Sequence, residues 1–172
     1  MRSLGTIQRV DQAVSTLCLS HRFSPSVARV SRWVSKSGDG HFYLAIGLLL
    51  AVSDGDRGLT FLLCGLLAFA IELPIYTSLK RRFRRARPSH LPAFITPSDL
   101  YSMPSGHTAA AFLMAMLLSH FYPEMAMLYW SWAAAIGLSR VLLGVHFITD
   151  VLVGAALGVG VARFALTFSF PV

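Results

Sequence analysis

The segment from Ser139 to Asp150 places three ionisable side chains between two apolar runs. A polar group in such surroundings is costly unless it is paired, reached by water or used, so these residues are candidates for a functional site. If the chain is helical from His146 onward, Asp150 lies one turn further on the same face, where its carboxylate could bond one imidazole nitrogen. The other nitrogen is then free to act as a nucleophile or general base, and Arg140 supplies a permanent charge that can grip phosphate oxygens.

A second candidate site surrounds His107. The sequence Pro104-Ser105-Gly106-His107 opens an apolar run that is predicted to be a helix. Backbone N–H groups in the first turn of a helix have no intrahelical partner, so those at Ser105 and Gly106 can bind a phosphate. His107 lies in the same turn and faces the same region. A lone histidine at the end of a span is more often an interfacial side chain, so this position needs support from the other clusters.

The third cluster is a basic run from Lys80 to Arg87, which carries six of the fifteen Lys and Arg residues. Such a run beside a span is more often a topology signal that contacts lipid headgroups than a catalytic element. Glu72, Tyr76 and Lys80 repeat every four residues and share one helix face, on which Glu72 is predicted to pair with a basic residue. The residues from Ser89 to Met103 follow as a loop that could cover an active site.

The elements that must position these residues are membrane helices. Of the 172 residues, 55% are hydrophobic and 13% are charged, and a mean hydropathy of +0.60 is too high for an ordinary soluble domain of this size. Because about 20 apolar residues span a bilayer, the predicted fold is an all-α, polytopic transmembrane helix bundle of about five spans, or six. The first span is short and is expected to borrow residues from Val34 to Gly40. The candidate runs are His41–Ser53, Leu59–Leu79, Ser105–Phe121, Met125–Leu143 and His146–Phe168.

Residues 1–40 are predicted to form an N-terminal region ahead of a transmembrane domain, residues 41–172. Apolar residues recur at helical spacing among charged ones, which predicts one or two amphipathic helices in the membrane interface, interrupted near Ser24-Pro25. A solvated arm packed on the bundle fits the same pattern. No signal peptide is predicted, because Arg9 and Asp11 interrupt the stretch that would have to be apolar. In the last span, Gly154 and Gly158 form a small-residue face for close helix packing.

The net charge of +7 comes mainly from basic clusters in the N-terminal region and in the loop after the second span. These clusters predict anionic lipid headgroups or phosphate as partners. Nucleic acid is a poor alternative, because the basic loop lies between membrane spans. With five spans, thirteen of the fifteen basic residues and all three polar clusters emerge on one face of the membrane. A single site can therefore assemble there.

In order along the chain, the three clusters match a known family. Lys80 to Pro88 reads K-x6-R-P, Pro104 to His107 reads P-S-G-H, and Ser139 to Asp150 reads S-R-x5-H-x3-D. This resembles the three-part signature of the phosphatidic-acid phosphatase type 2 superfamily of membrane lipid phosphatases, which shares its site with vanadium haloperoxidases. Any one motif could arise by chance, but three complete motifs in order and on one membrane face are very specific.

The resemblance implies a role for each matching residue. His146 would attack phosphorus to form a phosphohistidine, with Asp150 orienting it, and His107 would protonate the leaving group and then activate water. His146 must then start neutral and His107 protonated, which predicts a bell-shaped pH profile. No metal and no cofactor is expected. The groups expected to hold the phosphoryl oxygens are Lys80, Arg87, Ser105, the Gly106 backbone and Arg140. The arginines outside the signature, assigned to headgroup attraction, are Arg81, Arg82, Arg84 and Arg85.

The function implied is that of a small bacterial membrane lipid phosphatase, with residues 41–172 as the phosphatase domain. It would be similar to phosphatases of phosphatidylglycerophosphate or undecaprenyl pyrophosphate, and its substrate would be a phosphomonoester or pyrophosphate of a membrane lipid. Two alternatives stay open: a lipid phosphotransferase that uses the same phosphohistidine, and a non-catalytic membrane transporter or scaffold. The resemblance implies an inner-membrane protein with its site on the periplasmic face, whereas the asymmetry of basic residues favours the cytoplasmic face. No oligomeric state is predicted.

Overall fold

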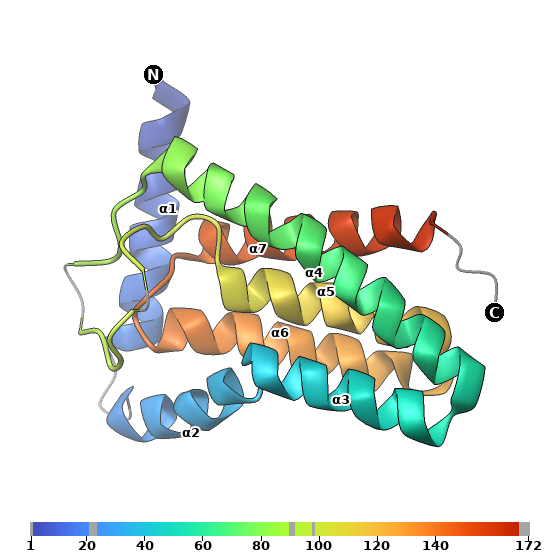
Figure 1. The fold of residues 1–172 in the computed structure, drawn as a ribbon. Coiled ribbons are helices and arrows are strands. Elements are labelled where there is room, and N and C mark those ends of the chain that lie inside the picture. The colour runs from blue at the N-terminus through green and yellow to red at the C-terminus, as the bar shows by residue number, and fades with distance from the viewer. Residues whose placement is uncertain (1, 21–23, 90–91, 98, 169–172) are drawn as a thin grey trace.

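The computed structural model describes residues 2–20, 24–89, 92–97 and 99–168, which are mostly helical, with one long loop before Gly106 (Figure 1). The predicted all-α class is therefore confirmed. The helices, in chain order, are α1 (Arg2–Leu19), α2 (Ser24–Lys36), α3 (Gly40–Ser53), α4 (Gly55–Phe83), α5 (Gly106–Phe121), the short 3₁₀ helix η1 (Pro123–Met125), α6 (Ala126–Leu142) and α7 (Ile148–Leu166).

The five predicted spans correspond to α3, α4, α5, α6 and α7, which form the transmembrane bundle. By length and composition α4 and α7 can each cross a membrane, and α3 and α5 are shorter apolar helices. One boundary was predicted wrongly, because α3 begins at Gly40 and borrows nothing from the residues before it. A turn at Ser37–Asp39 separates it from α2. The 14 residues of α3 are about 21 Å long, shorter than the hydrocarbon core of a bilayer.

Close packing of α5 against α7 forms the centre of the bundle. A Cβ added to Gly158 would lie 2.1 Å from the Ala109 carbonyl oxygen, and one added to Gly154 would lie 2.5 Å from that of Ser105. The predicted small-residue face of the last span is thus the surface on which α5 lies. Other apolar side chains point outward, as expected where lipid surrounds a bundle. Those more than half exposed include Leu49, Val52, Leu66, Leu73, Leu128 and Leu152.

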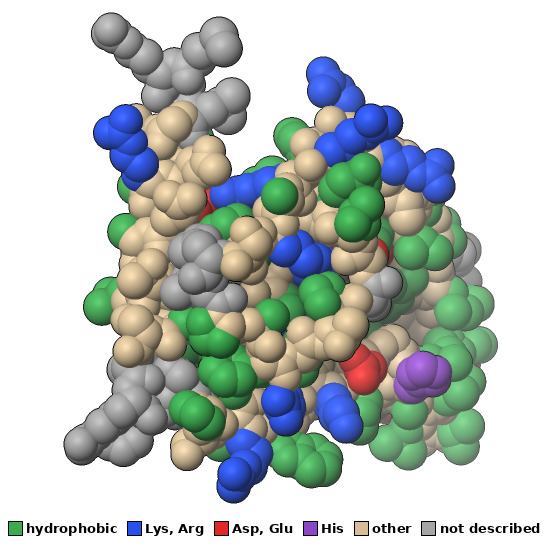
Figure 2. All heavy atoms as spheres, turned by 90° about the vertical axis from the view of Figure 1, so that its left-hand side faces the viewer, with side chains coloured by type: hydrophobic (Ala, Val, Ile, Leu, Met, Phe, Trp, Pro, Cys, Tyr) green, Lys and Arg blue, Asp and Glu red, His purple; other side chains and the backbone are tan. Residues whose placement is uncertain are grey.

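The ends of the helices that carry the three sequence clusters lie together at one end of the bundle (Figure 1). The last turn of α4, the first turns of α5 and α7 and the last turn of α6 all meet there. Viewed from that end, Lys and Arg side chains gather along two edges, one over α2 and one over the end of α4 (Figure 2). The prediction that the clusters assemble on one face therefore agrees with the arrangement of the helices.

The N-terminal helices α1 and α2 also lie at this end, and both pack on the bundle, α1 on α6 and α7 and α2 on α6. Their polar faces are the buried ones. In α1, Asp11 is 0% exposed, whereas Leu17 is 78% exposed; in α2, Ser35 is buried, whereas Trp33 is 72% exposed. An amphipathic helix that turns its apolar side chains outward, beside the membrane-spanning helices, suits the headgroup region. The prediction of two N-terminal helices, interrupted near Ser24-Pro25, is confirmed, whereas their place in the membrane interface stays a prediction.

Candidate active site

His146 lies in the turn between α6 and α7, and its two ring nitrogens have unlike neighbours. Nδ1 lies 2.8 Å from the Ser102 carbonyl oxygen, which can only accept a hydrogen bond. Nε2 lies 3.3 Å from Nη1 of Arg87, which can only donate one. These neighbours assign the proton to Nδ1 and the lone pair to Nε2. The side chain is 3% exposed, so the free lone pair is held in one direction.

Asp150 lies beside this histidine but contacts it less directly than predicted. Its Oδ2 is 3.7 Å from Nδ1 of His146, an ion-pair distance that is too long for a hydrogen bond. The predicted hydrogen bond on Nδ1 is made by the Ser102 carbonyl instead. The same carboxylate oxygen accepts the Phe147 backbone N–H at 2.8 Å. Asp150 therefore caps the start of α7 while its charge faces the imidazole.

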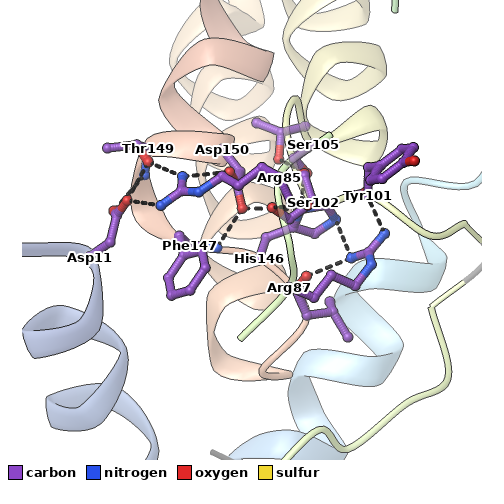
Figure 3. A network of polar contacts seen from close by, with 12 residues as sticks. Asp11, Arg85, Arg87, Tyr101, Ser102, Ser105, His146, Phe147, Thr149 and Asp150 are labelled. Atoms are coloured by element: carbon purple, nitrogen blue, oxygen red, sulfur yellow. Dashed lines mark hydrogen bonds and ion pairs between the residues drawn. The ribbon is translucent and has the colours of Figure 1, made fainter. Parts of the chain in front are cut away.

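Arg85 has a different place from the one predicted for it. It was assigned to headgroup attraction, but its side chain is largely buried and points into the bundle end (Figure 3). One guanidinium nitrogen donates to Asp150 at 2.8 Å and to the Thr149 hydroxyl at 2.5 Å, and the other pairs with Asp11 of α1. Asp11 also accepts the Thr149 N–H at 3.1 Å. The N-terminal helix is thus joined to the carboxylate that faces His146.

The two cations of the first motif, Lys80 and Arg87, share one carboxylate. Asp99, in the loop before α5, pairs with the Lys80 ammonium and accepts from Arg87 at 2.7 Å. Both cations also donate to the Tyr101 carbonyl, at 2.8 Å and 3.1 Å. Arg87 spans the site, because its Nη1 donates to the Val145 carbonyl at 2.5 Å as well as facing His146. The side chains therefore lie where they can meet an anion in front of Nε2.

Ser105 and Gly106 start α5 next to His146. The Ser105 N–H donates to the Asp150 carbonyl oxygen at 3.0 Å, and the Ser105 hydroxyl bonds Thr108 at 2.8 Å. Gly106 admits the side chain of Tyr76, because an added Cβ would be 2.9 Å from two ring carbons and from the phenolic oxygen. Only glycine lets the aromatic ring approach the helix start this closely.

His107, in the first turn of α5, also has an aspartate partner. Its Nε2 lies 3.0 Å from a carboxylate oxygen of Asp39, in the turn before α3. Arg140 closes this side of the site with a side chain that is 4% exposed. It donates to the Ser35 hydroxyl at 2.6 Å, and its Nε has no hydrogen-bond partner within the described residues. A buried guanidinium nitrogen without a partner is the kind of group that an anionic ligand satisfies.

Two pKa shifts in the loops bear on the chemistry. Burial lowers the pKa of His146 to about 4, and the charges of Arg140 and Arg87 act in the same direction, while Asp150 opposes them. The imidazole is therefore neutral at physiological pH. Burial alone would raise the pKa of Asp99. The Lys80 ammonium opposes this through its charge and a hydrogen bond, and Tyr76 and Arg87 add hydrogen bonds, so the pKa of Asp99 lies below its ordinary value.

Sequence reasoning missed the acidic partners of this site: Asp11, Asp39 and Asp99. Asp39 stands immediately before an apolar run, and Asp99 is the one acidic residue between the first two motifs, so both positions carried a weak signal. Glu72 was predicted to pair with a basic residue, but it forms no ion pair with any described residue. It is buried two turns before Lys80, deeper in the bundle than the cations. Across the described ranges no cluster of three or more His, Cys, Asp or Glu side chains could hold a metal ion.

Comparisons with known proteins agree with this arrangement. A sequence model of the PAP2 superfamily matches residues 59–171, a range that contains all three motifs. The decaprenylphosphoryl-5-phosphoribose phosphatase of Mycobacterium tuberculosis is 37% identical over 143 residues, which cover 78% of this chain and 76% of the relative.

Two crystal structures share the fold. A transmembrane PAP2 type phosphatidylglycerolphosphate phosphatase from Bacillus subtilis has a TM-score of 0.77 at 27% identity, over 95% of this chain and 86% of that one. LpxE of Aquifex aeolicus has a TM-score of 0.79 at 27% identity, over 91% and 94%. In both comparisons the similarity extends well beyond the motifs, through most of the helices.

Proposed function

Because the chain belongs to the PAP2 superfamily, we propose that it hydrolyses the terminal phosphate of a membrane lipid through a phosphohistidine on His146. The coarser statement, that it is a membrane lipid phosphatase of this family, rests on the family match and on relatives that are phosphatases. The proposal adds the nucleophile, the acid and the phosphate ligands.

The arrangement around His146 is the observation that carries the proposal. Nδ1–H points at the Ser102 carbonyl, so Nε2 presents a lone pair toward Arg87 and the start of α5. The lowered pKa keeps that lone pair free of a proton. As Nε2 bonds to phosphorus, the ring gains positive charge, which the nearby Asp150 carboxylate stabilises. The nucleophile is thus oriented before substrate arrives.

Lys80, Arg87 and Arg140 would take the negative charge of the transferring group. The transition state of phosphoryl transfer spreads charge over three equatorial oxygens, and fixed cations and N–H donors stabilise it. The buried, unpartnered Nε of Arg140 and the first N–H groups of α5 suit this role. We propose that these groups supply the positive charge that a metal ion supplies in other phosphatases, so that the reaction needs none.

His107 would serve the leaving group and then the water. In the first step the bond from phosphorus to the lipid oxygen breaks, and that oxygen takes a proton from the imidazolium of His107. In the second step His107 takes a proton from water as the water oxygen bonds to phosphorus and the bond to His146 breaks. Asp39, 3.0 Å from Nε2, stabilises the protonated form that the first step requires. The products are inorganic phosphate and a lipid alcohol when the substrate is a phosphomonoester, or inorganic phosphate and a lipid phosphate when it is a diphosphate.

We propose a phosphomonoester or diphosphate of a membrane lipid as the substrate, and the periplasmic face of a bacterial inner membrane as the place of reaction. The exposed apolar side chains of the spans suit a protein that is surrounded by lipid and acts on a substrate from the same bilayer. Relatives are named for lipid-linked phosphates, among them decaprenylphosphoryl-5-phosphoribose and phosphatidylglycerolphosphate. The orientation can be tested with single cysteines at Ser89, near the site, and at Ser53, at the opposite end, in a cysteine-free background. Labelling of intact cells by an impermeant reagent at Ser53 alone would refute the periplasmic site.

The experiment that tests the function is phosphate release by the purified protein in detergent, with a chelator present. A panel of lipid phosphates and diphosphates would be compared for the wild type and His146→Ala. We expect metal-independent release that disappears in the variant, and acid-labile phosphate on the wild-type protein during turnover. Consumption of the lipid without free phosphate would indicate transfer to another acceptor rather than hydrolysis. No reaction of folded wild-type protein with any lipid would refute the proposal.

A further inference from the structure

A cavity of about 420 Å³ opens beside the reacting centre, between α2, the loop before α5 and the end of α6. His107 and Arg140 line it, whereas His146 is not among its lining residues. Because His107 is the proposed acid for the leaving oxygen, the cavity lies on the leaving-group side of the phosphorus. Its volume falls in the range of small-molecule sites, about 300–1,000 Å³, and is larger than a lone ion requires.

Three cations of α2 line this cavity: Arg29, Arg32 and Lys36. Their spacing of three and four residues puts them on one face of the helix. None of the three pairs with a carboxylate in the part of the chain that the structure describes. Arg32 donates to the Phe94 carbonyl at 2.5 Å, which holds its guanidinium at the loop that edges the cavity. Figure 2 shows the row of basic side chains over α2 on this face.

The charge inside the cavity is strongly unbalanced. With Arg140, four permanent cations face it against one carboxylate, that of Asp39, which already bonds His107. The buried Nε of Arg140 has no partner, although a guanidinium normally uses all its donors when it is removed from water. A concave surface with such an excess of positive charge concentrates anions. The chemistry of the cavity is therefore that of a phosphate site.

We propose that this cavity is a second anion subsite, and that the preferred substrate carries a second phosphoryl group in its leaving group. This inference rests on the proposed function, because that function places the leaving group beside His107. Arg29, Arg32 and Lys36 are exposed at the mouth, whereas Arg140 is buried next to the reacting centre. A second phosphoryl group that contacts the exposed α2 cations must therefore lie farther from the reacting centre than Arg140 does. The subsite thus fits a phosphodiester separated from the reacting phosphate by a short polyol.

The alternative explanation is that the α2 cations only attract the anionic surface of the bilayer. The chain contains a matched set for comparison, because Arg81, Arg82 and Arg84 are also exposed at this end of the bundle and do not line the cavity. Replacing either set removes three positive charges from the same membrane face. A general electrostatic effect would follow from both replacements, and a subsite effect from only one.

The test uses two synthetic lipids with identical acyl chains in neutral detergent micelles. In one, the phosphomonoester is on diacylglycerol; in the other, it is on a glycerol that a phosphodiester joins to diacylglycerol. Phosphate release gives kcat/KM for each lipid, and their ratio measures the preference for the second phosphoryl group. The variants are Arg29→Gln/Arg32→Gln/Lys36→Gln and, as the control, Arg81→Gln/Arg82→Gln/Arg84→Gln. The double variant Arg29→Gln/Lys36→Gln spares the contact of Arg32 with Phe94 if the triple variant folds poorly.

We expect the wild type to prefer the lipid with two phosphoryl groups. The α2 variant should lower the ratio about 10-fold to 100-fold, mainly through KM, as charge-assisted hydrogen bonds are lost, while the control leaves the ratio unchanged. Equal loss of preference in both variants, or an unchanged ratio in the α2 variant, would overturn the subsite while leaving the phosphatase intact. Absence of phosphate release from both lipids by the wild type would overturn the proposed function and the subsite together.

Discussion

Replacing Arg85 with Gln should destabilise the protein and slow it, because this arginine lies between two buried carboxylates. Asp11 and Asp150 both have side chains that are 0% exposed, and Arg85 is 19% exposed. Removing one member of a buried ion pair typically costs about 3–5 kcal/mol. Asp150 keeps the Phe147 N–H and Asp11 keeps the Thr149 N–H, so the lower end of that range applies. We expect a loss of about 3 kcal/mol, roughly 100-fold in the unfolding equilibrium.

The assay is unfolding in detergent, followed by helix content, together with phosphate release at saturating lipid. Arg82→Gln is the control, because Arg82 is exposed and close in sequence, and its loss should change stability by less than about 0.5 kcal/mol. Arg85→Lys keeps the charge but lacks the fork that reaches two carboxylates, so its stability should fall between those of the wild type and Arg85→Gln. The kcat of Arg85→Gln should fall by more than its unfolded fraction explains, because Asp150 is no longer held beside His146.

A double-mutant cycle with Asp11→Asn separates the contact from general destabilisation. If Asp11 and Arg85 interact as the structure shows, the free energies of unfolding lost in the two single variants should add up to more than the loss in the double variant. The difference should be about 1 kcal/mol or more. The reasoning is refuted if Arg85→Gln is as stable and as active as Arg82→Gln. Additive losses in the cycle would contradict the coupling of α1 to the site.

Three further predictions follow from the geometry. His146 must be neutral to attack, and its pKa is lowered to about 4. The value of kcat/KM, corrected for ionisation of the substrate, should therefore persist below pH 6 and decline only near pH 4. A decline near the ordinary histidine pKa of about 6.5 would contradict this. Gly158→Ala should lower the free energy of unfolding in detergent by about 1–3 kcal/mol, because an added Cβ would lie 2.1 Å from a carbonyl oxygen. Gly160→Ala, where an added Cβ has nothing within 4 Å, should have no effect or stabilise the protein by up to about 1 kcal/mol. Asp39→Asn should slow phosphate release from alkyl phosphates by about 10-fold or more. Release from aryl phosphates should be unchanged, because their leaving oxygen needs no proton from His107. Equal slowing with both kinds of substrate would argue that Asp39 does not support His107 as the acid.

The spans could be predicted from the sequence because each is a continuous apolar run, and one rule about bilayer thickness is enough to find them. The boundary of α3 could not, because the same rule demanded about 20 residues and the turn at Ser37–Asp39 allows only 14. A short helix is stable here because α3 lies along α4, which extends for 29 residues. Length rules describe a helix alone in lipid, whereas α3 is held by its neighbour.

The meeting of the three motifs could also be predicted, since two spans, an even number, separate the loop of the first two motifs from the turn of the third. The place of Arg85 could not. The four arginines of the basic run that lie outside the signature look alike in sequence. Which of them turns inward depends on the end of α4 and on the left-handed residue Arg84, at φ 47°. The inward one is recognised only by its partner Asp11, which lies 74 residues away on a helix that sequence reasoning placed at the membrane surface.

The motifs supply the cations, the histidines and Asp150, and segments outside the motifs supply three further carboxylates that offset the positive charge. Four of the eight acidic residues, each from a different segment, face this site: Asp11, Asp39, Asp99 and Asp150. Without them, like charges close together in a partly dry site would repel strongly. Asp99 shows the consequence most clearly, because its carboxylate contacts both Lys80 and Arg87, the groups proposed to bind phosphate. A phosphate that binds these cations must displace that carboxylate or share its donors, so substrate binding is in large part an exchange of one anion for another. The binding free energy is then the difference between two ion pairs. A lipid with a second phosphoryl group can gain further affinity at the three cations of α2, which form no ion pair with a carboxylate among the described residues.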